Sequence, residues 1–341
     1  MNVREILDRD VAMNVPGHAV SILTRANPGL ETDGRLVGRL VGTMGLSSHI
    51  YYARRRNGYG LPARLCLRAR LALERFEAPR TNIFVQDVKP GWLDMARRNV
   101  LIPNQEFCAA ETVGLLGRID MVICKSRHAE EIFRGLGCNA RYTGFTCEDR
   151  YDPDVPRTRN RFLHVAGVTK QKGSKVLLDL WRAHPEWPEL VALVRSNLID
   201  ADAYAAPNIT LVSEMVPSAR LAALQNECAV HVCPSEAEGF GLALCEGLAC
   251  GAVVVTTDGP PMNELIRPEH GVLVPYRETR PRTLGMRHFV DPDALAAAID
   301  RIVAMDEAEI AEMGRRARRF YLDKRAAFER RFVEALAEIH G

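Results

Sequence analysis

One short segment carries two glutamates, Glu238 and Glu246, with seven residues between them and an apolar run on either side. It reads PSEAEGFGLALCEGLACG over residues 234–251, preceded by AVHVC and followed by AVVVT. The flanking runs are typical of buried strands, and the small and apolar residues after Gly241 predict a helix. The segment therefore predicts a strand–loop–helix–strand unit, which restricts the chain to folds in which helices cover parallel sheets.

The loop in front of this helix is suited to an anionic ligand such as a phosphate. The free N–H groups and the positive end of the helix dipole face the loop, and its glycines allow close approach to the main chain. Glu238 precedes the helix, and Glu246 lies about one and a half turns into it. Carboxylates about 10 Å apart or less could bind hydroxyls on both sides of a diphosphate. An ordinary capped helix with solvated acids is the alternative interpretation.

Strand and helix patterns alternate along the whole chain. Strands are predicted at 19–25, 48–53, 82–87, 99–103, 120–125, 140–144, 161–165, 190–194, 209–212, 229–233, 252–256 and 271–274. Helices are predicted at 33–43, 62–77, 108–117, 127–136, 292–304, 306–321 and 323–339. This alternation predicts two Rossmann-like domains with parallel sheets. The polar, proline-bearing run 148–160 is predicted to link an N-terminal domain, 1–150, to a C-terminal domain, 158–322.

The run PSEAEGFGLALCEGLACGAVVVTTDGPPMNEL, residues 234–265, resembles the signature of retaining, family-4-type GT-B glycosyltransferases, or glycosyl transferases group 1. The shared features are E-G-F-G-L, the interval to the second glutamate, the small residues that end the helix, and the Gly/Pro turn before Glu-Leu. The resemblance implies an α/β GT-B fold with two Rossmann-like domains whose parallel sheets face a central cleft. It also implies that the last helix, about 323–341, packs back on the N-terminal domain.

The activity implied by the resemblance is transfer of a sugar from a nucleotide-sugar donor to a hydroxyl of a glycan or glycolipid acceptor. Anomeric configuration is retained, and neither a metal nor a cofactor is needed. Glu238 would contact the transferred sugar as the catalytic residue, either as nucleophile or as stabiliser, and Glu246 would bind the ribose hydroxyls. The lack of an Asp-x-Asp motif at any strand end agrees with the absence of a metal.

A second donor-side feature is the turn after the strand at 161–165, where HVAGVTKQKG places Lys170 and Lys172 at a helix N-terminus. Lys172-Gly173 matches a Lys-Gly pair of the family, but Val168 stands where the family has an arginine. We expect Lys170 to replace that cation, with Arg195 as the alternative. The expected donor-binding set is Lys170, Lys172, Arg195, Met215, Val216, Gly239, Phe240, Gly241, Leu242 and Glu246, with backbone groups of Met215 and Val216 facing the base.

The N-terminal half is expected to supply the acceptor site. In place of a glycine-rich loop after the first strand it has TRANPGLETDGR, residues 24–35. Where the family has a histidine at a strand end, the chain reads LIPNQEF. Polar residues at strand ends give the acceptor-side candidates, which are Asp87, Asn104, Gln105 and Glu106. His128 is interpreted as a surface or capping residue.

Composition fits this interpretation. The chain has 341 residues, nine cysteines without C-x2-C or zinc spacing, and a net charge of +2, too low for a dedicated nucleic-acid binder. Charged residues stand within 1–16 where a signal peptide needs an apolar core, and no apolar run is long enough to span a membrane. We therefore expect a cytoplasmic protein, with peripheral attachment to the cytoplasmic face of the membrane left open.

Two basic runs bear on membrane attachment. Residues 54–80 contain eight arginines against two glutamates, interleaved with leucines and aromatic residues, and 314–325 reads GRRARRFYLDKR. Such stretches can lie on an anionic membrane and hence fit a lipid-linked acceptor, but they also occur as solvated faces of packed helices.

Two other functional classes were weighed. A catalytically silent relative that binds a nucleotide sugar or glycan as a scaffold fits the atypical Val168, whereas the intact pair Glu238 and Glu246 favours an enzyme. A Rossmann oxidoreductase is disfavoured because no G-x-G-x-x-G follows an early strand.

Overall fold

The computed structural model describes residues 18–53, 79–167, 169–195 and 197–340. The chain divides into two compact units. The N-terminal unit comprises residues 1–125, 129–143 and 329–341, and the C-terminal unit comprises residues 126–128 and 144–328.

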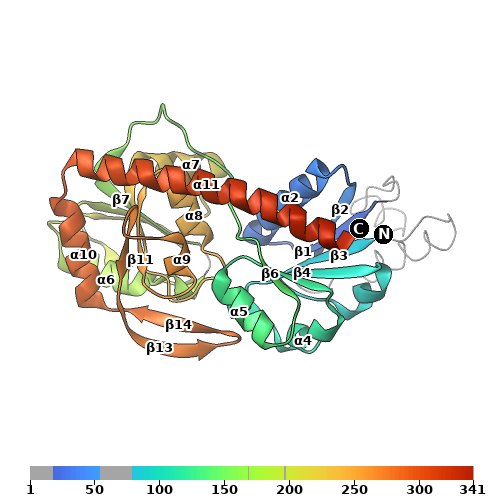
Figure 1. The fold of residues 1–341 in the computed structure, drawn as a ribbon. Coiled ribbons are helices and arrows are strands. Elements are labelled where there is room, and N and C mark those ends of the chain that lie inside the picture. The colour runs from blue at the N-terminus through green and yellow to red at the C-terminus, as the bar shows by residue number, and fades with distance from the viewer. Residues whose placement is uncertain (1–17, 54–78, 168, 196, 341) are drawn as a thin grey trace, which may run out of the picture. The chain divides into compact units, whose positions relative to one another are not determined.

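The N-terminal unit is built on a sheet of six parallel strands in the order β2-β1-β3-β4-β5-β6 (Figure 1). The strands are β1 (Val20–Arg25), β2 (Ser48–Ala53), β3 (Thr81–Val85), β4 (Arg98–Ile102), β5 (Met121–Cys124) and β6 (Ala140–Tyr142). β3 and β5 are buried along their whole length, which explains their unbroken apolar runs. The strand order reverses between β1 and β3, and ligands of such sheets bind at the carboxyl ends of the strands beside that point.

Short helices connect these strands. They are α2 (Pro28–Thr43), α4 (Ala110–Val113) and α5 (Arg127–Gly135), with 3-10 turns η1 (Pro90–Met95), η2 (Gln105–Phe107) and η3 (Leu116–Arg118). Placing residues 24–35 in a loop was wrong for its second half, because Asn27 caps a helix that begins at Pro28 and accepts a 2.9 Å hydrogen bond from the Leu30 N–H. The helix predicted at 108–117 is interrupted after Val113, and the one at 62–77 lies outside the described residues.

The C-terminal unit has a second sheet of six parallel strands, in the order β12-β11-β10-β7-β8-β9 (Figure 1). Its strands are β7 (Thr158–Gly167), β8 (Glu189–Val194), β9 (Ile209–Val212), β10 (Cys228–Cys233), β11 (Val253–Thr257) and β12 (Gly271–Val274). The order reverses between β7 and β10. The α/β fold with two parallel sheets is thus confirmed, and the predicted linker ends earlier than expected because β7 begins at Thr158.

Helices cover both faces of this sheet. They are α6 (Ser174–Ala183), α7 (Ser218–Glu227), α8 (Leu242–Ala249), α9 (Met262–Leu265) and α10 (Pro292–Ala304), with turns η4 (Lys170–Lys172) and η5 (Asp202–Tyr204). Alternate residues of β7 point to opposite faces. Phe162 packs in the core cluster that contains α6 and α10, and Leu163 packs in the cluster that contains Leu224 of α7.

Two further elements differ from expectation. The two helices predicted at 306–321 and 323–339 are one helix, α11 (Glu307–His340), because the sequence FYLDKR between them contains no glycine or proline to end it. Its residues up to 328 belong to the C-terminal unit and the remainder to the N-terminal unit. A hairpin of β13 (Tyr276–Arg282) and β14 (Gly285–Val290), which the sequence patterns did not predict, forms a separate two-stranded sheet.

Candidate active site

The two predicted donor-side segments lie at the carboxyl ends of β7 and β10, which are neighbours at the point where the strand order reverses. The loop after β10 carries Glu238, and the turn after β7 carries Lys172. The Lys172 Nζ lies 2.5 Å from the Glu238 Oε1, and the two side chains are 14% and 9% exposed. The Glu236 N–H donates to the Gln171 carbonyl at 2.8 Å, so the main chains of the two segments are also joined.

Gly173 allows this close approach. Its φ is 68°, and a Cβ built there would lie 2.1 Å from the carbonyl oxygen of Pro234. No other residue fits at this contact without displacing the loop. The Lys-Gly pair noted in the sequence therefore has a packing reason in addition to its charge.

A buried histidine supports the same turn. The imidazole of His164, in β7, donates from Nδ1 to the Val232 carbonyl at 2.7 Å, and its Nε2 accepts from the Ser174 hydroxyl at 2.8 Å. Complete burial is the main reason that the pKa of His164 falls to about 4, so the ring is neutral near pH 7. It ties β7 to β10 and to the start of α6.

Helix α8 begins directly after Gly241, as predicted, and its first N–H groups lie next to the Glu238 loop. Gly241 has φ 96°, a left-handed conformation that suits glycine. The Phe240 ring is buried and contacts the Phe145 ring edge-on at 5.5 Å between centroids. The loop is thus anchored by a side chain while its backbone stays close to the helix N-terminus.

Glu246 lies inside α8 and is half-buried. The Gln225 Nε2 donates to its Oε2 at 2.8 Å. Loss of hydration raises the pKa of Glu246, against the opposing effects of Arg150, the Gln225 hydrogen bond and Lys172. The charge of Lys172 therefore acts on both glutamates of the pair.

The other predicted donor-side residues are placed less closely. Lys170 is exposed, and Met215 is 74% exposed in the turn after β9. Val216 is half-buried against the cluster under α7. The Arg195 side chain is half-buried, and its N–H donates to the Gly167 carbonyl at 3.3 Å. The residue at position 168 lies outside the described residues.

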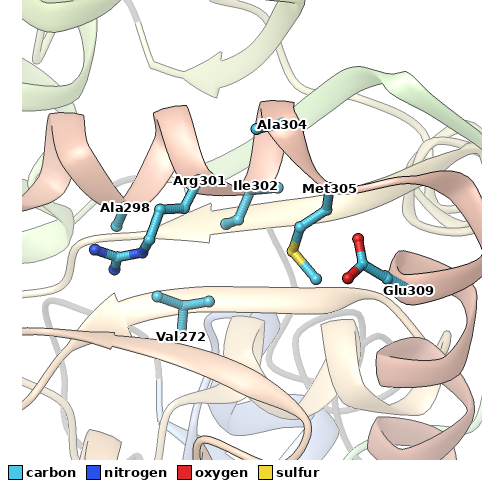
Figure 2. A pocket seen from close by; sticks show the side chains of 7 residues that line it. All are labelled: Val272, Ala298, Arg301, Ile302, Ala304, Met305 and Glu309. Carbon is cyan, nitrogen blue, oxygen red and sulfur yellow. The ribbon is translucent and has the colours of Figure 1, made fainter.

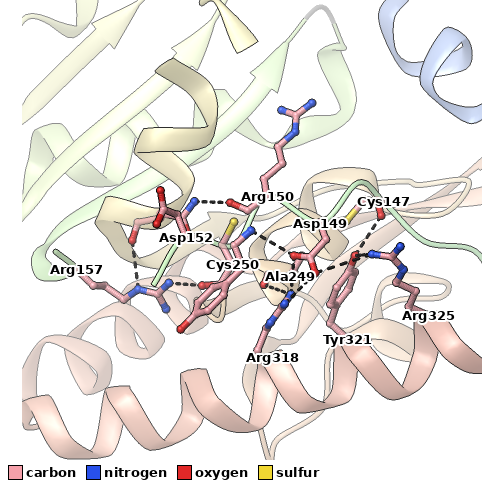
Figure 3. A network of polar contacts seen from close by, with 12 residues as sticks. Cys147, Asp149, Arg150, Asp152, Arg157, Ala249, Cys250, Arg318, Tyr321 and Arg325 are labelled. Carbon is pink, nitrogen blue, oxygen red and sulfur yellow. Dashed lines mark hydrogen bonds and ion pairs between the residues drawn. The ribbon is translucent and has the colours of Figure 1, made fainter. Parts of the chain in front are cut away.

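The far end of α8 is held by two arginines (Figure 3). The Arg157 guanidinium donates to the carbonyls of Cys250 and Gly251 and, at 3.2 Å, to that of Asn226. Arg318 of α11 donates to the Ala249 carbonyl at 2.8 Å and pairs with Asp149. Cations at a helix C-terminus complement its dipole, so these contacts fix the helix whose other end faces the candidate site.

In the N-terminal unit, the predicted acceptor-side residues lie at the carboxyl edge of the sheet. Asp87, Gln105 and Glu106 are buried, and Asp87 forms an ion pair with Arg25 at the reversal of strand order between β1 and β3. Asn104 is half-buried between the ends of β4 and β5.

Gln86 precedes Asp87 and has an unusual backbone. Its φ is 83°, a conformation rare for a residue with a side chain. Its amide group and the main chain of Asn104 exchange two hydrogen bonds, of 3.1 and 3.3 Å. Strained backbone of this kind clusters at functional sites, which makes this edge a candidate site independently of the side chains predicted there.

Two charged residues at this edge were missed by sequence reasoning. The Lys125 Nζ lies 2.6 Å from the Asp33 Oδ2 and 3.0 Å from the Asn104 Oδ1, and both ionic side chains are buried. The available signal was the lysine that directly follows β5. Asp33 gave no signal, because the prediction placed the start of its helix five residues too late.

A separate cavity of about 460 Å³ lies between β12, α10 and the start of α11 (Figure 2). Its lining is mainly apolar, with Arg301 and Glu309 as its charged residues. It contains none of the predicted site residues. Within the described ranges, no group of three or more His, Cys, Asp or Glu side chains is arranged to hold a metal ion.

The predicted membrane features are placed only in part. The basic run 54–80 lies outside the described residues except at its end. The run 314–325 lies in α11, where Arg315 and Arg316 pair with Glu312. Among the helices of the described part of the chain, none is both long and apolar enough to cross a bilayer.

Comparison with known proteins agrees with this geometry. Residues 159–305 match the family described as glycosyl transferases group 1. The chain is 28% identical over 114 residues to the alpha-maltose-1-phosphate synthase of Mycolicibacterium smegmatis. That alignment covers 33% of this chain and only 29% of the synthase.

Solved structures match over nearly the whole chain. A glycosyltransferase from Rickettsia africae is 15% identical, covers 95% of this chain and 99% of its own, and has a TM-score of 0.69. The HepE protein of Anabaena, solved in complex with UDP and glucose, is 12% identical, with coverages of 94% and 100% and a TM-score of 0.66. The fold is that of the GT-B glycosyltransferases, and the matches together support a glycosyltransferase of group 1.

Proposed function

We propose that this protein transfers a sugar from a nucleotide-sugar donor to a hydroxyl of a glycan or glycolipid acceptor, with retention of anomeric configuration and without a metal ion. The observation that carries the proposal is the contact of Lys172 with Glu238 where the strand order reverses between β7 and β10. The family match of residues 159–305 spans this site.

The chemistry of the reaction suits these groups. When the bond between the anomeric carbon and the diphosphate breaks, negative charge builds on the leaving phosphate and positive charge on the sugar. Lys172 and the N–H groups at the start of α8 would stabilise the phosphate. Glu238 would stabilise the sugar or fix its hydroxyls, and Glu246 would bind the ribose.

Without donor, Lys172 and Glu238 neutralise each other in a site that is largely shielded from water. An entering diphosphate would compete for the lysine and leave the carboxylate free to face the sugar. The acceptor would bind to the polar edge of the N-terminal unit, where Asp87, Asn104, Gln105 and Glu106 lie.

The test is a kinetic comparison of two conservative variants. We expect Glu238→Gln to abolish sugar transfer and donor hydrolysis while nucleotide affinity stays within about threefold, because its partners are on the sugar. Glu246→Gln should instead weaken binding of the nucleotide about tenfold, the loss of one charge-assisted hydrogen bond. Proton NMR of the product should show the anomeric configuration of the donor. The reversed pattern in the two variants, or an inverted product, would contradict the assignment.

A further inference from the structure

The hairpin β13–β14 is set apart from the rest of the C-terminal unit. It belongs to neither six-stranded sheet, and every residue from Tyr276 to Pro281 is exposed. Residues 276–290 contain four arginines and one glutamate. An isolated two-stranded hairpin is only marginally stable in water, so this one needs support from the body of the unit.

Its support comes through one residue of β14. The His288 N–H donates to the Glu236 carbonyl at 2.7 Å, and the imidazole is 4% exposed, lying against Gly259 and edge-on to Tyr276. Arg287 pairs with Glu236. The hairpin is therefore fixed to the loop that carries Glu238.

The opposite face of the hairpin is basic. Side chains alternate between the two faces of a strand, so Arg280 and Arg282 lie on the face away from His288. Arg280 stands directly opposite Arg287 across the strand pair, and their guanidinium carbons lie 4.9 and 4.6 Å from the centre of the Phe289 ring. Like charges directly opposite each other are destabilising, so the arrangement gains from an anion outside the protein.

Some of this charge is balanced within the protein. Arg280 pairs with Glu278 and Arg287 with Glu236, so four arginines against two glutamates leave two positive charges in excess. Apolar groups are exposed beside them: Tyr276 is 41% exposed and Met286 36%. A polyanion dissolved in water gains little from such apolar side chains, whereas a bilayer accepts both kinds of group at its surface.

We propose that the hairpin β13–β14 is a docking surface for a bilayer of anionic phospholipid. Its arginines contact the headgroups, and Tyr276 and Met286 enter the boundary with the acyl chains. Attachment here goes beyond sugar transfer: it would bring the loop that carries Glu238 to a membrane in which a lipid-linked acceptor is concentrated.

The experiment measures partition of the full chain into vesicles of phosphatidylglycerol and phosphatidylcholine in equal parts, and into vesicles of phosphatidylcholine alone. We expect Arg277→Gln with Arg280→Gln to lower partition into the anionic vesicles about thirtyfold, from about one factor of five for each arginine near the surface. Met286→Ser should lower it about threefold without changing the salt dependence.

The matched control removes the same charge from α11. Arg315, like Arg280, pairs with a glutamate, and Arg319, like Arg277, is exposed, so Arg315→Gln with Arg319→Gln should leave partition within about twofold. Equal losses from both double variants, or equal partition into the two kinds of vesicle, would overturn the proposal. Binding of single-stranded RNA through Arg277 and Arg280, with Met286→Ser behaving as wild type on vesicles, would overturn it in favour of a soluble polyanion.

This test is independent of the proposed activity. Both hairpin arginines are exposed and outside the candidate active site, so the double variant should retain its unfolding midpoint and its donor hydrolysis in vesicle-free solution. A wild-type chain that binds anionic vesicles through the hairpin but hydrolyses no nucleotide sugar would refute the proposed function and leave the docking surface intact.

Discussion

At the scale of single residues, Gly173 joins the two segments of the candidate site. We predict that Gly173→Ala lowers the free energy of unfolding by about 3 kcal/mol, because the left-handed backbone costs about 1 kcal/mol and the new Cβ must displace the Pro234 carbonyl. Gly167 is the control, since it also has positive φ, 58°, but open space around a Cβ. Urea unfolding should show a loss of only about 1 kcal/mol for Gly167→Ala; equal losses would contradict the packing argument.

Glu246 exchanges stability for binding. Its folded-state pKa is raised, so the native state binds more protons than the unfolded state between the two pKa values, and stability falls as pH rises through that window. We predict that Glu246→Gln stabilises the protein at pH 7 while weakening nucleotide binding. The stabilisation should vanish below the unfolded-state pKa, where both carboxyls are protonated. Thermal unfolding at pH 4 and 7 tests this, and a variant less stable than wild type at pH 7 would contradict it.

The glutamate interval and the Lys-Gly pair could be read from the sequence because each is a local pattern in one strand–turn–helix segment. The direct contact between Lys172 and Glu238 could not, because it depends on β7 and β10 being neighbours although β8 and β9 separate them along the chain. The buried pair of Asp33 and Lys125 was missed for the same reason, since 92 residues lie between its members.

At the scale of elements, α8 depends on what holds its C-terminal end. Arg157 is partly buried, and its removal would leave carbonyls of Cys250, Gly251 and Asn226 without this donor. We predict that Arg157→Met lowers the free energy of unfolding by about 3 kcal/mol and weakens nucleotide binding through misplacement of α8. Arg220→Met, which removes an exposed ion pair with Glu227, should cost less than about 1 kcal/mol. Urea unfolding of both variants makes the comparison, and equal costs would contradict it.

Among the elements, the parallel strands were predictable because each is a short apolar run between polar turns. The hairpin β13–β14 was not, since β13 is exposed on both faces and its two-residue turn, Thr283-Leu284, has neither glycine nor asparagine. The continuity of α11 was also missed, although the absence of a helix-breaking residue near Leu322 was visible in the sequence.

At the scale of the whole molecule, buried histidines make stability depend on pH. Burial lowers the pKa values of His18, His164 and His231 to about 4 each. The unfolded chain therefore binds more protons than the native state between about pH 6.5 and 4, so stability is fully present above 6.5 and is lost as pH falls through this window.

We predict a loss on the order of 3 kcal/mol for each fully buried histidine across that window. Urea unfolding at intervals from pH 7 to 4 measures it, and His164→Gln should remove part of the slope. A free energy of unfolding that stays constant from pH 6.5 to 4, after allowance for the carboxyl groups, would contradict the neutral buried state of these rings.

The most direct test of the donor site is calorimetric titration of the full chain with the diphosphates of uridine, guanosine and adenosine and with their sugars. We predict that at least one nucleotide binds and stabilises the folded state by RT ln(1 + [L]/Kd). Lys172→Gln should weaken that nucleotide at least tenfold, because it removes the cation paired with Glu238. Failure of every nucleotide to bind the wild-type chain, or an unchanged Kd for Lys172→Gln, would contradict a nucleotide-sugar site between the ends of β7 and β10.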